Sequence, residues 1–130
     1  MKSNAQVSVE FIIVLSLLFG VLLLSLAVFG EKNSGFILLQ KGSEAQLEAR
    51  KISLAVNSVF LAGNGAETEI ALGANPDSNI LFSGNAVQVH WSGGFADSAL
   101  ITENINAASF SGTGTATVKN IEGVVSVEKA

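Results

Sequence analysis

One acidic side chain, Glu10, lies directly before a long run of apolar residues and is the first candidate for a chemical role. A carboxylate that enters an apolar environment needs a positive partner, because its desolvation is costly. The sequence contains no lysine or arginine between Lys2 and Lys32. Glu10 therefore either stays in a polar boundary layer such as the headgroup region or pairs with a cation that forms nearby.

The apolar run extends from Phe11 to Gly30 and contains no charged residue. A helix of this length spans about 30 Å, which is the thickness of the hydrocarbon core of a bilayer. Ser16 and Ser25 are its weakly polar members, and their hydroxyls can bond back to helix carbonyls. The run therefore predicts a helix of membrane length.

Two general interpretations of this run are open. The first is a secretory signal peptide that is cut after Ser25-Leu26-Ala27, so that the mature chain starts at Val28. The run is longer than the roughly 7–15 residues of such a peptide, and an acidic residue directly precedes it. The second is a plain N-terminal membrane anchor, with Lys2 inside and the rest of the chain outside.

A third interpretation uses the residues just before the run, which match the pattern Q-x-S-x-E-x-x-x-L. The fixed positions of this pattern are Gln6, Ser8, Glu10 and Leu15. The pattern resembles the class III signal peptide of archaeal type IV pilin precursors. This resemblance covers only the segment up to Gly30, and it implies that a prepilin peptidase removes Met1–Ala5. The apolar segment would then stay on the mature protein.

The resemblance also implies a role for Glu10. Cleavage between Ala5 and Gln6 creates a free α-amine on Gln6, and Glu10 follows four residues later, one helical turn away. In the pilin family this glutamate is thought to meet the amine of a neighbouring subunit. We therefore expect Gln6, Glu10 and Phe11 to act in filament assembly. The implied partners are identical or related pilins, the prepilin peptidase, the membrane assembly platform and, before assembly, the membrane.

The helical pattern continues beyond the apolar run. An apolar stripe with steps of four and three residues predicts a helix from Val7 to Leu61, weakened at one of its glycines. The stripe consists of Leu38, Ala45, Ala49, Ile52, Val56 and Val59. The glycines in question are Gly30, Gly35 and Gly42. Ala62-Gly63-Asn64-Gly65 is a strong stop signal.

From Glu67 onward the apolar period changes to two, which predicts β-strands. The expected strands are Thr68–Leu72, Asn79–Phe82, Ala86–Trp91, Ser98–Glu103, Thr115–Lys119 and Val124–Glu128. The expected turns are Asn75–Ser78, Ser83–Asn85 and Ile121–Gly123. The segment Asn104–Ser111 is too small and polar to assign. One antiparallel sheet packed on the second half of the helix is the expected architecture.

The strand region offers no evident catalytic, cofactor or metal site. His90 is the single histidine and is expected on the wet face of its strand, since Val87 and Val89 alternate with it. Acidic residues are scattered and lack the spacing of a calcium loop. They are Glu67, Glu69, Asp77, Asp97 and Glu103. The aromatic residues Phe60, Phe82, Trp91, Phe95 and Phe110 are expected in the core.

Composition narrows the classes of function. The chain has 130 residues, a charged share of 14% and a net charge of -4, and it contains no cysteine. These features disfavour nucleic acid as a partner and exclude disulfide or thiolate chemistry. No group of residues points to an enzyme.

The expected fold is α+β, with a long N-terminal hydrophobic helix, type IV pilin-like, followed by a small antiparallel β-sheet head. We expect a leader at 1–5, a transmembrane or filament-core helix at 6–30, its amphipathic continuation at 31–63 and a β-rich head at 64–130. The leading hypothesis is a structural subunit of an archaeal type IV pilus-like surface filament for adhesion or surface contact. In this hypothesis we expect a single-pass membrane precursor with its C-terminus outside, which then becomes part of an extracellular surface filament. The alternative is a membrane-tethered extracellular β binding module that does not polymerise.

Overall fold

The computed structural model describes residues 2–73 and 77–130, with side chains from Ser8 onward in the first range. Over these residues the chain forms one long helix and two small sheets, and the expected α+β class is confirmed. The elements are α1 (Lys2–Ala62), β1 (Glu67–Leu72), β2 (Asn79–Ser83), β3 (Ala86–Trp91), β4 (Gly94–Ala99), β5 (Ile105–Ala107), β6 (Phe110–Ser111), β7 (Gly114–Ile121) and β8 (Val124–Lys129). The chain divides into two compact units, Met1–Ile37 and Leu38–Ala130.

Helix α1 contains the whole range that the sequence predicts and runs through its glycines without a break. It contains no proline, and residues with high helix propensity dominate it. The helix ends at Ala62, where Gly63 adopts a φ of 90° and donates its N–H to the Phe60 carbonyl at 3.3 Å. A glycine in the left-handed region is a common helix stop, because it lacks the Cβ that penalises this conformation.

Within the unit 38–130, one face of α1 is buried against the sheets. The buried positions are Ala45, Ala49, Ile52, Val56 and Val59, which are the later members of the predicted stripe. The prediction is wrong for Leu38, which is 53% exposed. The stripe becomes buried only from Ala45 onward, so Leu38 continues the period without sharing the core. Helical period alone therefore located the face but not the point where its burial begins.

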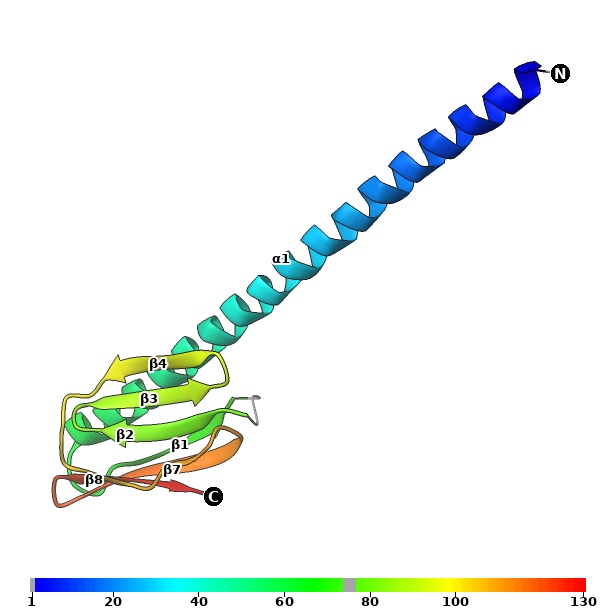
Figure 1. The fold of residues 1–130 in the computed structure, drawn as a ribbon. Helices are drawn as coiled ribbons and strands as arrows, with labels where there is room; N and C mark the ends of the chain where they lie inside the picture. The colour runs from blue at the N-terminus through cyan, green and yellow to red at the C-terminus, as the bar shows by residue number, and fades with distance from the viewer. Residues whose placement is uncertain (1, 74–76) are drawn as a thin grey trace. The chain divides into compact units, whose positions relative to one another are not determined.

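The strands form two four-stranded sheets, where the sequence led us to expect one. Their orders are β1-β7-β8-β5 and β4-β3-β2-β6, and every pairing is antiparallel except the parallel pair β5–β8. Figure 1 shows β4, β3 and β2 lying side by side along the C-terminal part of α1. Short strands β5 and β6 occupy the segment that the sequence pattern left unassigned.

Side chains of α1 form hydrogen bonds with an outer edge of each of the two sheets. At β4, Gln46 donates to the Asp97 carbonyl at 3.0 Å, and just beyond this strand Asn57 accepts the Ile101 N–H at 2.9 Å. On β1, Lys51 donates to the Ala71 carbonyl. Unpaired edge groups invite association with other strands unless they are covered. The helix therefore serves as the cover for one edge of each sheet.

Most strand predictions agree with the structure to within two residues, but one is wrong. The strand expected at Ser98–Glu103 is instead β4, because a tight turn at Ser92–Gly93 returns the chain at once from β3. Three consecutive small residues after Trp91 resemble a loop in sequence, although Gly94 pairs with Trp91. The turns expected at 83–85 and 121–123 are confirmed. The turn expected at 75–78 includes Asn75 and Pro76, which lie outside the described residues.

Candidate assembly segment and head cavity

The residues of the signature pattern all lie on α1, in its first turns. The side chains of Ala5 and Gln6 lie outside the described part of the structure, whereas those of Ser8, Glu10 and Leu15 are exposed. Ser8 and Leu15 are seven residues apart and share one side of the helix, and Glu10 lies on the other side. The helix therefore does not gather these side chains into one cluster.

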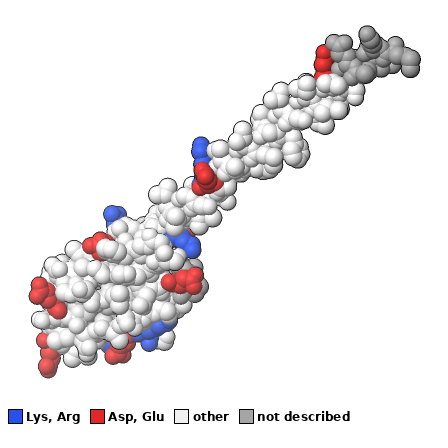
Figure 2. Space-filling view, viewed as in Figure 1, with Lys and Arg blue, Asp and Glu red and all other residues white. Residues whose placement is uncertain are grey.

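The segment that follows Glu10 exposes all of its large apolar side chains. Their exposed fractions lie between 52% at Val28 and 75% at Phe29. Ser16 and Ser25 donate to the carbonyls of Ile12 and Val21, each at 2.8 Å, as the sequence predicts. In Figure 2 this stretch of the helix carries no charged atoms. The polar groups of this helical segment are thus hydrogen-bonded within the helix. Its apolar surface is uncovered in the single chain.

Glu10 marks the N-terminal boundary of this surface. Its carboxylate is exposed and forms no ion pair within the described residues. The next charged side chains along the helix are Glu31 and Lys32. Any association that covers the apolar segment up to its N-terminal end must therefore place a cation near Glu10 or leave the carboxylate at a polar margin.

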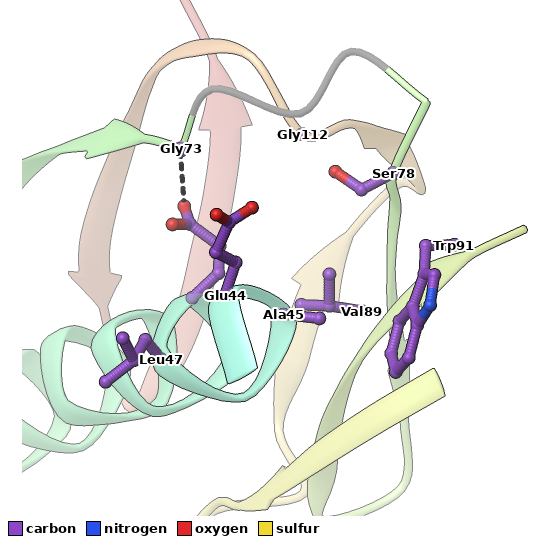
Figure 3. Close-up of a pocket in the computed structure, with 9 residues that line it drawn as sticks. Glu44, Ala45, Leu47, Gly73, Ser78, Val89, Trp91 and Gly112 are labelled. Carbon is purple, nitrogen blue, oxygen red and sulfur yellow. Dashed lines mark hydrogen bonds between the residues drawn. The ribbon is translucent and has the colours of Figure 1, made fainter. Parts of the chain in front are cut away.

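A cavity of about 300 Å³ opens between α1 and the sheets of the head (Figure 3). Ala45 and Val89 form its apolar floor, and the indole ring of Trp91 stands at one side. The carboxylate of Glu44 extends toward the opposite rim. Glu48 also lines the cavity, and its carboxylate accepts the Gly73 N–H. The cavity thus combines an apolar interior with a negative rim, and none of its described lining residues is a histidine.

The remaining candidate groups of the head pack against neighbouring side chains. His90 is half-exposed, and its ring stacks on Phe95 at a centroid distance of 5.4 Å. Phe95 is 57% exposed, so its predicted place in the core is wrong; it lies on the edge strand β4, opposite His90. The described residues contain no group of three or more His, Asp and Glu side chains that could hold a metal ion. The other four aromatic residues pack, half-buried, against the core.

The fold and the segment define an α+β protein with one N-terminal helix that is long and apolar enough to span a membrane. Comparisons with protein-family models, curated proteins and solved structures found no match.

Proposed function

We propose that this chain is the precursor of a structural subunit of a type IV pilus-like surface filament, of the archaeal kind. The observation that carries the proposal is the coincidence of the Q-x-S-x-E-x-x-x-L pattern with the start of a fully exposed, uncharged helical segment. Neither a conventional signal peptide nor a plain anchor requires the four fixed positions of the pattern. A subunit that is cut before Gln6 and packs through its helix requires both features.

Two physical properties of the chain support assembly through the helix. The segment Phe11–Phe29 exposes apolar side chains around its whole circumference, so a single neighbouring surface cannot cover it. A bilayer covers such a helix before assembly, and a bundle of sister helices covers it afterwards. The head is closed by its own core and by edge-capping bonds from α1, and it does not need the apolar segment for burial.

In this proposal Glu10 sets the register of assembly. Removal of Met1–Ala5 creates an amine on Gln6, and in the filament this amine of one subunit meets the Glu10 carboxylate of another. Cleavage thus supplies a cation for Glu10 at the subunit's own N-terminus, and an unpaired carboxylate would be strongly unfavourable in an apolar core. The peptidase and the membrane assembly platform are the other partners, and adhesion or surface contact is the proposed role of the filament.

The second candidate function is a membrane-tethered β module that binds a ligand without polymerising. The head cavity favours this candidate, because its apolar floor and two rim carboxylates would suit a small cationic group. Such a tether would keep Met1–Ala5 and remain a monomer in the bilayer. The two functions therefore differ in the N-terminus of the mature chain.

N-terminal sequencing or intact mass of the protein recovered from its native cell surface tests the proposal. We expect a chain that begins at Gln6 and is found in filaments. A chain that begins at Met1 and stays monomeric in the membrane would replace the filament with the tethered module. A start at Val28 would make the chain an ordinary exported β domain.

A further inference from the structure

A row of exposed leucines runs along α1 on a face that the head core leaves uncovered, with Leu47 and Leu54 also lining pockets beside the head. The leucine row consists of Leu47, Leu54 and Leu61, which are 64%, 66% and 70% exposed. Residues seven apart lie on one face of a helix. The buried positions of the same helix segment, such as Ile52 and Val56, lie on the opposite face. From Leu47 to Leu61 the row is about 21 Å long at 1.5 Å per residue. Single exposed leucines need no explanation, whereas a continuous apolar surface often marks a contact site.

A matching concave surface lies on the apolar segment of the same chain. A shallow groove of about 460 Å³ follows the helix, with Ser16 and Gly20 at its base. The larger side chains Ile12, Ile13, Leu17, Val21 and Leu24 complete its lining. A Cβ at Gly20 would meet no atom within 4 Å, so the notch is empty in the single chain. Small residues four apart allow close approach of a second helix.

We propose that the leucine row of one copy docks into the Ser16–Gly20 groove of a second copy, with the two helices parallel. This inference rests on the proposed filament function and names the contact surfaces for it. In coiled-coil packing, a knob inserts among residues i, i+3, i+4 and i+7 of the facing helix. Leu54 would occupy such a hole, formed by Ile13, Ser16, Leu17 and Gly20. Position 54 of one copy then lies at the height of position 16 of the other.

Charge complementarity favours this occupant of the row. In this register Arg50 of the first copy lies within about 4 Å, in axial height, of Glu10 of the second. Arg50 flanks the leucine row on one side, and Glu10 flanks the groove on the side that faces it in a parallel pair. Neither side chain has an ion pair within the described residues. Arg50 is thus a second cation for Glu10, beside the amine of Gln6.

A parallel contact between two leucine rows is less favourable by the same reasoning. It would place Arg50 of each copy next to Arg50 of the other and would leave the uncharged segment uncovered. Like charges that meet across a helix pair are destabilising. An uncharged groove with an acid at its margin has no such conflict.

Cysteine cross-linking in the full-length chain tests the docking, because the natural sequence contains no cysteine. Leu54→Cys in one copy and Ser16→Cys in another are co-expressed, and the surface filaments and the detergent-solubilised chains are oxidised. We expect a disulfide that links the Leu54→Cys chain to the Ser16→Cys chain. Leu18→Cys is the matched control, because Leu18 lies at nearly the same height on the opposite face of the helix. Equal linkage of the position 16 and position 18 variants to position 54 would overturn the proposal.

Two further variants test the notch and the charge pair. Gly20→Leu fills the groove and should abolish the 54–16 link, whereas Gly30→Leu, also free of neighbours within 4 Å, should preserve it. Arg50→Glu should reduce the link, and Arg50→Lys should largely retain it. Linkage that survives Gly20→Leu would show that the groove is not the contact. A dominant 54–54 product would show that two leucine rows meet instead.

The outcomes separate this inference from the proposed function. Filaments of chains that start at Gln6 but give no 54–16 link would overturn the docking and keep the filament. Position 54 lies about 57 Å along the helix from position 16, so two copies that both span one bilayer cannot form the link. A 54–16 link between uncleaved chains in detergent solution, without filaments at the cell surface, would keep the docking and remove the filament. If neither filaments nor the 54–16 link are found, the filament function and the docking are both overturned.

Discussion

A hydrogen bond between Glu48 and Gly73 joins α1 to the end of β1, in an arrangement that leaves no room for a side chain at position 73. The Gly73 N–H donates to Oε1 of Glu48 at 2.7 Å. A Cβ placed on Gly73 would lie 2.6 Å from Oε2 of the same carboxylate. The carboxylate therefore occupies the space that any other residue at position 73 would need, and the two residues form a coupled pair at the rim of the head cavity.

The first prediction is that Gly73→Ala destabilises the head by removing this bond. The glutamate side chain is flexible and can swing away, so the loss should equal that of one charge-assisted hydrogen bond, about 1–3 kcal/mol. Trp91 is the only tryptophan of the chain and lies in the head. Denaturant unfolding of the full chain in detergent, followed by Trp91 fluorescence, measures the change.

A double-mutant cycle supplies the control. Glu48→Ala should cost about as much as Gly73→Ala, and the combined variant should cost little more than either one alone, because the same bond is lost once. Glu48→Gln keeps an acceptor oxygen and should retain most of the stability. Additive losses in the combined variant would contradict the coupling of the two residues.

The second prediction concerns Asn120, which is 2% exposed and joins β7 to the end of α1. Its Nδ2 donates to the carbonyls of Val59 and Phe60, each at 3.3 Å, and its Oδ1 accepts the Gly123 N–H at 3.0 Å. Asn120→Ala removes the partner that Asn120 supplies to the Val59 carbonyl and the Gly123 N–H, whereas the Phe60 carbonyl keeps the Gly63 N–H. This change should lower the free energy of unfolding by about 2 kcal/mol. The same fluorescence assay measures it.

Asn120→Asp tests whether the donor atoms matter. A carboxylate there would be buried against two carbonyl oxygens, so the pKa of the introduced acid should lie above its usual value of about 4 in the folded state. Because the folded state then binds the proton more tightly than the unfolded state, stability should fall as pH rises from about 4 to 7. A variant with the pH profile of the natural chain would show that position 120 is not held against the helix end.

Local patterns predicted much of this fold, and the failures share a cause. The alternation of Val87 and Val89 located β3, and the four–three spacing of Ile52 and Val56 located the buried face of α1. Leu38 was misassigned because the start of burial depends on where the sheets meet the helix. The strand β4 was misassigned because the tight turn at 92–93 depends on its pairing with β3. Both outcomes depend on contacts between separate segments, and the hydrophobic period of one segment carries no information about those contacts. The bond from Gln46 to the edge of β4 joins residues 51 positions apart, and no local pattern reveals it.

The candidate assembly site could likewise be predicted only in part from the sequence. Glu10 and the apolar segment are visible in sequence because charge and hydropathy are properties of single residues. The leucine row was not identified from sequence, although Leu47, Leu54 and Leu61 repeat every seven residues. Two apolar faces share this part of α1, and only the structure tells which one the sheets cover. The role of Gln6 and Ser8 in processing stays a prediction.

The third prediction is that the head folds without the apolar segment. A fragment that begins at Glu31 retains the whole unit 38–130, including every strand and the core face of α1. We expect a folded, β-rich protein that unfolds cooperatively, as judged by circular dichroism and Trp91 fluorescence. Its exposed residues Phe36–Leu39 should promote weak association, which a fragment beginning at Gln40 should lack. Insoluble products from both fragments would mean that the core needs residues before Glu31.

The last prediction concerns Glu10 itself. Glu10→Ala should reduce the yield of surface filaments while cleavage before Gln6 continues, because the carboxylate acts in packing and not in peptide hydrolysis. Glu10→Gln is the matched control: it keeps the size and hydrogen-bonding capacity of the side chain but removes the charge, so it should also reduce assembly if pairing with a cation is the cause. Filament mass recovered by shearing and the N-terminal sequence of the membrane fraction are measured side by side. Normal filament yield from both variants would remove the register role of Glu10, and loss of cleavage in both would place Glu10 in recognition by the peptidase instead.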